Sequence, residues 1–249
     1  MEVHHHPHVE KKKFKEYLFE FIMIFLAVTL GFFAENLREH ISNRKKEKEY
    51  IQSLVEDLKK DTIKINYVVK KITERNKGID TFLSLLSDPA IISNSNRLFR
   101  LREDLGFPDF IYTDRTIQQL KNTGELRLIR VVKTSNLIIA YDADARNVLL
   151  LDNILNNIID PVIRSTNHIL DFSAIKGWTQ GLGYNNLQIP QEPIALLVKN
   201  RDALIEYSNN ISDYKRFALG FSRELINLKN EGAMLLAYLR QQYHLTNEN

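Results

Sequence analysis

The first strong feature of the sequence is an unbroken apolar run near its N-terminus. Residues Leu18–Ala34 read LFEFIMIFLAVTLGFFA, in which Glu20 is the one charged residue. A helix rises about 1.5 Å per residue, so roughly 20 residues cross a hydrocarbon core about 30 Å thick. The run is at the short end of that range, and Tyr17 extends it at the interface. The pattern therefore predicts a transmembrane helix over residues 17–35.

Two other interpretations of the apolar run are a buried core helix and a cleaved secretory signal. A core helix would leave an apolar surface on every helical face that continues at once into a charged helix. Signal cleavage requires small residues at the −3 and −1 positions, and the end of the run offers Phe32 and Ala34. We therefore expect an uncleaved signal anchor, which follows a short polar tail rich in His and Lys over residues 1–16.

After the membrane segment, apolar residues recur at alternating spacings of three and four. This heptad pattern predicts one helix over residues 36–87, continuous with the membrane segment, because no proline interrupts Glu35–Lys77. Asp88-Pro89 marks its end. The apolar stripe is a possible self-association seam, and its members are Leu37, Ile41, Ile51, Val55, Leu58, Ile65, Val69 and Ile72.

Two more long helices and a short helical insertion follow along the chain. Residues 90–131 are the insertion. Residues 134–172 keep one apolar register, and Pro161 within them predicts a kink. Residues 194–245 are expected to form the third long helix, and a register shift across Ser208–Asn210 predicts a local break or distortion.

The insertion carries its own start and stop signals. Asp114 or Thr113 is expected to cap a short helix that runs through Lys121, and Gly124 is expected to close it. Apolar residues after this helix should dock the insertion onto the long helices. Together with one residue inside it, they are Leu120, Leu126, Leu128 and Ile129.

Residues that form turns are few, since the 249-residue chain contains nine glycines and six prolines. Few turns indicate long elements, and no segment of useful length alternates between apolar and polar residues as a strand would. We therefore expect an all-α fold. It consists of one N-terminal transmembrane helix continuous with an elongated three- to four-helix bundle, which forms a soluble domain over residues 36–249.

Composition and charge exclude several functions. The absence of cysteine excludes a disulfide scaffold, a cysteine nucleophile and thiolate metal sites. The net charge is only +3, and the excess of basic residues lies beside the membrane segment, as membrane-flanking regions favour. A nucleic-acid-binding domain is usually more strongly basic. We therefore expect membrane lipid among the partners and no nucleic acid.

No group of residues forms a recognisable catalytic site. Asp142 and Asp144 are two residues apart on a predicted helix, so they do not share a face and make a poor acid–base pair. The N-terminal histidines lack a carboxylate shell that would orient them, which favours incidental metal binding. We expect no enzymatic activity, no cofactor and no specific metal site.

Two features are candidates for a binding function. Glu20 is an ionisable residue inside the membrane segment, where a charge is costly and commonly functional, although its place near the segment's end also allows snorkelling to the interface. The loop between the last two long helices contains Trp178 and Tyr184. These two aromatic residues either pack on the bundle or form an exposed contact surface.

Two stretches resemble a family of uncharacterised bacterial single-span membrane proteins. One is YLFEFIMIFLAVTLGFFAEN, followed by a helix that ends in QSLVEDLKKDT; the other is YTDRTIQQLKNTGELRLIR at Tyr112–Arg130. Family members have a short tail, a span with an early glutamate and a Glu-Asp-Leu-Lys helix, so the resemblance places Glu20 at the family's glutamate. This chain departs in having Phe19 where the family has glycine, and in its His-rich tail. The resemblance covers roughly the first half of the chain and implies the architecture, without an established activity.

The preferred functional hypothesis is a membrane-anchored helical scaffold or accessory subunit of a membrane complex, which binds further copies of itself or a membrane-protein partner. The alternatives are a sensor or ligand-binding bundle, and an ion-conducting oligomer that uses Glu20. Lys and Arg flank both ends of the span, so they do not decide its orientation. A short tail before a first span more often stays inside, which favours a single-pass protein of the inner membrane with a periplasmic C-terminal domain.

Overall fold

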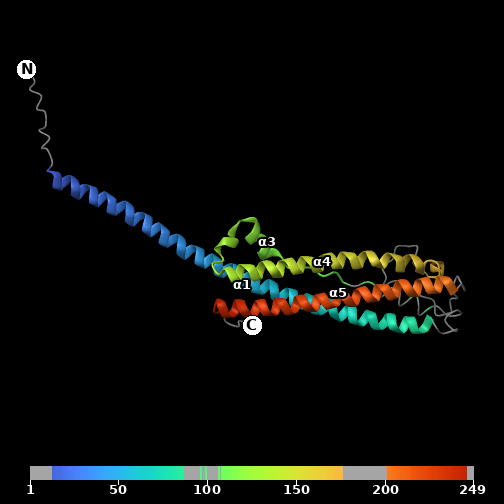
Figure 1. Cartoon of the computed structure of the whole chain (residues 1–249). Helices are drawn as coiled ribbons and strands as arrows, with labels where there is room; N and C mark the ends of the chain where they lie inside the picture. The colour runs from blue at the N-terminus through green and yellow to red at the C-terminus, as the bar shows by residue number, and fades with distance from the viewer. Residues whose placement is uncertain are drawn as a thin grey trace, which may run out of the picture. The chain divides into compact units, whose positions relative to one another are not determined.

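The chain folds as an all-α protein in the computed structural model, which describes residues 13–86, 96, 99, 106, 108–175 and 201–245. No strand occurs in these ranges, so the predicted fold class is confirmed. Three long helices dominate Figure 1. They are α1 (Phe14–Leu86), α4 (Val132–Thr166) and α5 (Arg201–Gln242), and the short elements are α3 (Arg115–Asn122) and the 3-10 helices η2 (Glu125–Leu128) and η3 (Phe172–Ala174).

The N-terminal part of α1, as far as Glu49, belongs to a unit of its own. Its large apolar side chains are exposed, and the most apolar stretch of 18 residues has none buried. This exposure argues against a buried core helix. In the part of the chain that the structure describes, this is the one helix long and apolar enough to cross a membrane, and an N-terminal signal sequence meets the same description.

From Tyr50 onward, α1 belongs to a second unit, in which it lies beside α4 and α5 (Figure 1). The buried apolar residues of this part of α1 recur at spacings of three and four, as a helix that packs on two neighbours requires. Their burial removes a continuous apolar stripe from water, which stabilises the fold by roughly 25 cal/mol for each Å² of apolar surface buried. They are Ile51, Leu54, Val55, Leu58, Ile65, Val68, Ile72, Ile79 and Phe82.

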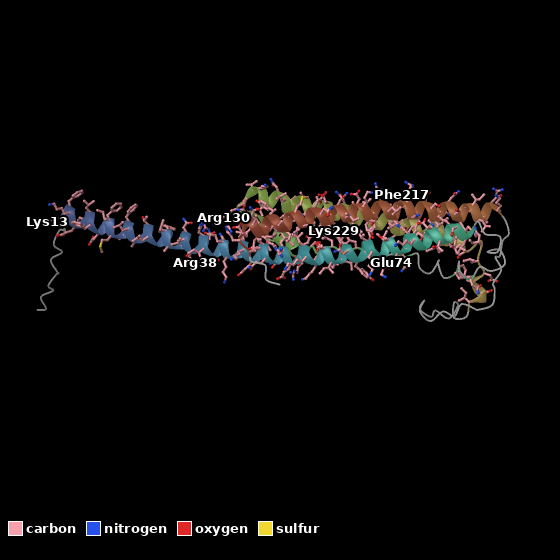
Figure 2. The ribbon with its side chains drawn as sticks, turned by 90° about the horizontal axis from the view of Figure 1, so that it is seen from below. Lys13, Arg38, Glu74, Arg130, Phe217 and Lys229 are labelled. Carbon is pink, nitrogen blue, oxygen red and sulfur yellow. The ribbon has the colours of Figure 1, made fainter. Side chains whose placement is uncertain are left out.

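Contacts between α1 and α5 connect residues far apart in the sequence. The Phe82 and Tyr207 rings meet edge to face, with centroids 5.1 Å apart. Figure 2 shows Lys229 on α5, whose Nζ lies 3.3 Å from Oδ1 of Asn66 on α1. These contacts make α1 an integral member of the bundle, which is completed by a large apolar core shared with α4.

Of the predicted break or local distortion at Ser208–Asn210, the break is wrong, because α5 is continuous through these residues. Tyr207 and Ile211 on either side are both buried, at a spacing of four. The amide of Asn210 donates to the carbonyl of Pro161 at 3.3 Å and to the hydroxyl of Ser165 at 3.1 Å. The polar residue is thus accommodated by α4, close to the proline that the sequence places inside that helix.

Gly232 permits a close approach between α4 and α5. A Cβ at this position would lie 3.1 Å from Cε2 of Tyr141 on α4. The Tyr141 hydroxyl in turn donates to Asp61 on α1 at 3.1 Å. The absence of a side chain at Gly232 therefore leaves room for a tyrosine that reaches from α4 to α1.

We predict that alanine is tolerated very differently at the two glycines of α5. Gly220→Ala should stabilise the protein by up to about 1 kcal/mol, because alanine favours helix and nothing lies within 4 Å of the new Cβ. Gly232→Ala should lose that gain, because the new methyl crowds Tyr141. Urea unfolding of both variants in detergent would measure the difference, and equal stabilisation would contradict the packing role of Gly232.

Candidate interaction site

Three buried carboxylates hold the segment Tyr112–Lys121 on the long helices. Asp57 and Asp61 belong to α1 and Asp142 belongs to α4, and each is 1% exposed. We call these three residues the carboxylate anchors. A buried carboxylate is strongly destabilising unless it accepts hydrogen bonds or pairs with a cation. The partners of each anchor therefore decide whether it stabilises the fold.

Asp57 caps α3 from another helix. The backbone N–H of Thr116 donates to Asp57 Oδ2 at 3.2 Å, and the Thr116 hydroxyl donates to the same oxygen. Arg115 Nη2 lies 3.1 Å from Asp57 Oδ1. The first turn of a helix has free N–H groups that a side-chain oxygen can satisfy. The sequence predicted this cap at Asp114 or Thr113, but Asp114 makes no capping hydrogen bond, and the role falls to a residue of α1.

Asp61 joins the same segment to α4. Its Oδ1 accepts the backbone N–H of Thr113 at 2.8 Å, and its Oδ2 accepts the Tyr141 hydroxyl at 3.1 Å. Burial raises the pKa of Asp61, and the hydrogen bonds from Thr113 and Tyr141 and the charge of Lys64 only partly offset it. Lys64 also donates to the carbonyl of Ile111 and the hydroxyl of Thr113, both at 2.9 Å.

Asp142 is the anchor with the most basic surroundings. It accepts hydrogen bonds from Lys121 on α3, from Arg146 Nε and Nη2 at 3.1 Å each, and from the Tyr112 hydroxyl at 3.2 Å. Burial acts to raise the pKa of Asp142, but the hydrogen bonds and charges of Arg146 and Lys121 outweigh it and hold the pKa below its usual range. Asp142 is thus an ionised structural residue. Asp144, two residues further along α4, faces a different surface, as this spacing predicts.

The anchors bring together the two stretches that carry the family resemblance. Asp57 and Asp61 lie in QSLVEDLKKDT, and the groups of the insertion that they bind lie in the first five residues of YTDRTIQQLKNTGELRLIR. Apolar docking adds to the polar contacts, since Leu120 and Ile129 are buried, whereas Leu126 is only partly buried. Contacts of these stretches therefore dock the insertion on α1 and α4.

We predict that Asp57→Ala loosens the insertion. The change leaves the buried Thr116 N–H and hydroxyl without their acceptor, which should destabilise the fold by about 2–4 kcal/mol. Hydrogen exchange of the full-length protein should speed up across residues 112–128. Glu56→Ala, at an exposed position in the same turn of α1, is the control and should leave exchange unchanged. Equal exchange in both variants would refute the role of Asp57.

Asp109 and Asp152 form an acidic pair beside α4. Asp152 on α4 is 8% exposed, and burial together with the charge of Asp109 raises its pKa to about 6, although the Phe110 backbone N–H donates to it. The amide of Asn156 donates to Asp109 at 3.3 Å. Near neutral pH, Asp152 is therefore an ionised carboxylate in unfavourable surroundings.

We predict that Asp152→Asn stabilises the protein at pH 7. The unfolded chain releases this proton near the ordinary pKa of 3.8 and the folded chain near 6. Stability from this group is therefore fully present below pH 3.8 and is lost as the pH rises to about 6. The variant should gain on the order of 1 kcal/mol at pH 7 and little at pH 4. Urea unfolding at both pH values tests this, with the exposed Asp160→Asn as control, and a gain independent of pH would contradict it.

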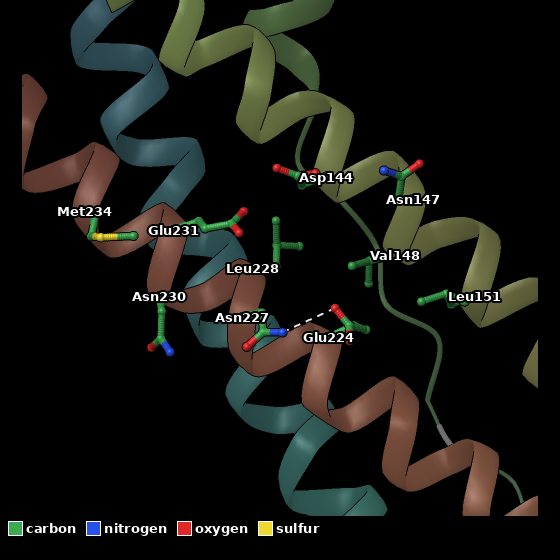
Figure 3. Close-up of a pocket in the computed structure, with 10 residues that line it drawn as sticks. All are labelled: Asp144, Asn147, Val148, Leu151, Glu224, Asn227, Leu228, Asn230, Glu231 and Met234. Carbon is green, nitrogen blue, oxygen red and sulfur yellow. Dashed lines mark hydrogen bonds between the residues drawn. The ribbon is translucent and has the colours of Figure 1, made fainter.

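A groove between α4 and α5 is the candidate interaction surface. Three adjoining cavities form it, because the first two share Asp144, Glu231 and Met234, and the second and third share Leu151 and Glu224. Figure 3 shows Asp144 on α4 and Glu231 on α5 extending toward the space between the two helices. We call this surface the α4–α5 groove. Unlike the anchors, its polar groups are accessible to a partner.

The predicted self-association seam is divided between two environments. Leu37 and Ile41 are 52% and 61% exposed on the N-terminal part of α1. The later members lie in the chain's own core, where α4 and α5 already cover them, so only the first two are accessible to another copy. The covered members are Ile51, Val55, Leu58, Ile65 and Ile72, which are buried, and Val69, which is partly buried.

The remaining predicted site residues are placed as follows. Glu20 lies on the exposed, apolar part of α1. Trp178, Tyr184 and the N-terminal histidines lie outside the described residues. In the described ranges, no three His, Asp or Glu side chains are grouped as metal ligands would be. Sequence reasoning did not identify the anchors or the groove.

No family model, curated protein or solved structure matches this chain. The family resemblance of the two stretches therefore stays a prediction. The structure shows a mostly helical protein with one long apolar helix near its N-terminus.

Proposed function

We propose that this chain is a membrane-anchored scaffold or accessory subunit, which acts by binding another protein at the membrane. The observation that carries the proposal is that two apolar surfaces stay exposed on a chain that buries a large apolar core. The N-terminal part of α1 exposes its apolar residues on all sides, which suits lipid, and the α4–α5 groove exposes others on the bundle. An exposed apolar groove on a folded domain, such as the α4–α5 groove, is typical of a surface that binds another protein.

The membrane assignment follows from the same helix. An anchor over residues 17–35 would keep the bundle at the membrane surface, and we propose the periplasmic side of an inner membrane for it. The basic residues on both sides of the span suit anionic lipid headgroups. The exposed Leu37 and Ile41 directly follow the span, where they are accessible to a neighbouring helix in or near the membrane.

We predict that the full-length protein leaves its native membrane as part of a larger assembly. Native mass spectrometry after extraction in mild detergent should find the 29.1 kDa chain in a complex of defined stoichiometry. A carbonate wash beforehand should leave the protein in the membrane fraction, as an integral anchor requires. A chain that is released by carbonate, or one that is monomeric both in detergent and after crosslinking in the membrane, would overturn the proposal.

A further inference from the structure

The α4–α5 groove exposes more apolar surface than the packing of two helices requires. Four of its apolar side chains are large and accessible: Met234 is 66% exposed, and Ile154, Phe217 and Leu151 are 48%, 40% and 37% exposed. Figure 2 shows Phe217 on the outer side of α5. Leu151 and Ile154 belong to α4, and Phe217 and Met234 belong to α5, so both helices contribute to the apolar lining of the shared cavities. A groove of this form, between two antiparallel helices, accepts the apolar stripe of one further helix.

The charges in the groove are arranged in sequence along it. Its middle cavity is lined by Asp144, Glu224 and Glu231, and by no Lys or Arg among the described residues. Arg216 and Arg223 line the cavity at one end, and Lys133 lines the cavity at the other. The groove is therefore acidic in the middle, and its basic residues lie toward the two ends.

The acidic middle is electrostatically unfavourable within the chain itself. Burial raises the pKa of Glu231, and the charge and hydrogen bond of Asp144 and the charge of Glu224 raise it further. The amide of Asn227 donates to Glu224 at 3.3 Å, as Figure 3 shows by a dashed line, and no Lys or Arg is among the described residues that line this cavity. A positive charge brought against Asp144 and Glu231 would relieve their mutual repulsion.

The same charges disfavour a second copy of this chain as the occupant. A two-fold pairing centred on the middle of the groove places its acids against those of the copy, and like charges that meet at an interface are unfavourable. A different protein with basic residues opposite the middle of the groove brings a positive charge against these acids. Charge complementarity therefore selects a heterologous partner.

We propose that the α4–α5 groove binds an amphipathic helix of a different membrane protein, which packs apolar side chains against Leu151, Ile154, Phe217 and Met234 and places Lys or Arg against Asp144 and Glu231. This inference rests on the proposed function and specifies its contact surface. The apolar contacts supply affinity, and the basic residue fixes the register of the bound helix.

The test is site-specific crosslinking of the full-length protein in its native membrane. A photoreactive benzophenone amino acid replaces Met234 in one sample and Ile63, a 69% exposed residue on α1, in the control. Mass spectrometry then identifies the crosslinked residues. The expected result is an adduct at position 234, absent at position 63, with a helical segment of another membrane protein that has Lys or Arg within one turn of the crosslink.

Neutralising the acids tests the charge argument separately. Asp144→Asn combined with Glu231→Gln should reduce the yield of this adduct at least about fivefold. The thermal unfolding midpoint should stay unchanged or rise, because the variant removes repulsion, so loss of folding is not the cause. Glu206→Gln, at an exposed position of α5, should leave the yield unchanged. An adduct yield that does not respond to the double variant would overturn the role of the acids.

Other occupants give other results. An adduct with a second copy of this chain, an adduct with lipid alone, or equal labelling at positions 234 and 63 would overturn the inference. If native mass spectrometry still shows a complex in those cases, the proposed function stands and the groove is not its contact surface. If no complex is present, the proposed function fails together with the inference.

Discussion

The carboxylate of Asp61 lies where three segments of the chain meet, and its two oxygens bind two of them. One oxygen accepts a backbone N–H of the insertion, and the other accepts the hydroxyl of Tyr141 on α4, while Asp61 itself belongs to α1. Because the side chain is fully buried, these hydrogen bonds are required rather than incidental. Asp57 and Asp142 bind further groups of the same insertion. The packing of α1 on α4 is therefore inseparable from the docking of the insertion.

Sequence patterns predicted what depends on periodicity. The long helices follow from the spacing of apolar residues. Gly124, whose backbone adopts the left-handed conformation that glycine favours, follows the end of α3 as its residue type indicates. The anchors were missed because a heptad pattern counts apolar residues, whereas Asp61 occupies a buried position of the stripe between Leu58 and Ile65. A carboxylate in the middle of an apolar stripe is itself a signal, but it does not identify donors about fifty residues away. The continuity of α5 at Asn210 likewise depends on a contact with α4 that no local pattern contains.

The groove was not predictable for a related reason. Sequence shows that α4 and α5 are amphipathic, but not which part of each apolar face is left uncovered once the bundle forms. Asp144 and Glu231 are far apart in the chain and acquire their mutual repulsion only when the helices align. The anchors and the groove thus use one chemistry in opposite ways. Buried acids with donors hold the chain together, whereas the accessible acids of the groove line its middle cavity with no Lys or Arg beside them among the described residues.

The order of synthesis also matters for the anchors. Residues 112–116, which supply the donors for Asp57 and Asp61, are synthesised about fifty residues after them. Until then, Asp57 and Asp61 lack the donors that the insertion supplies, and Asp61 also lacks Tyr141 of α4. The surroundings that satisfy these two carboxylates are therefore completed only after the insertion and α4 have been synthesised.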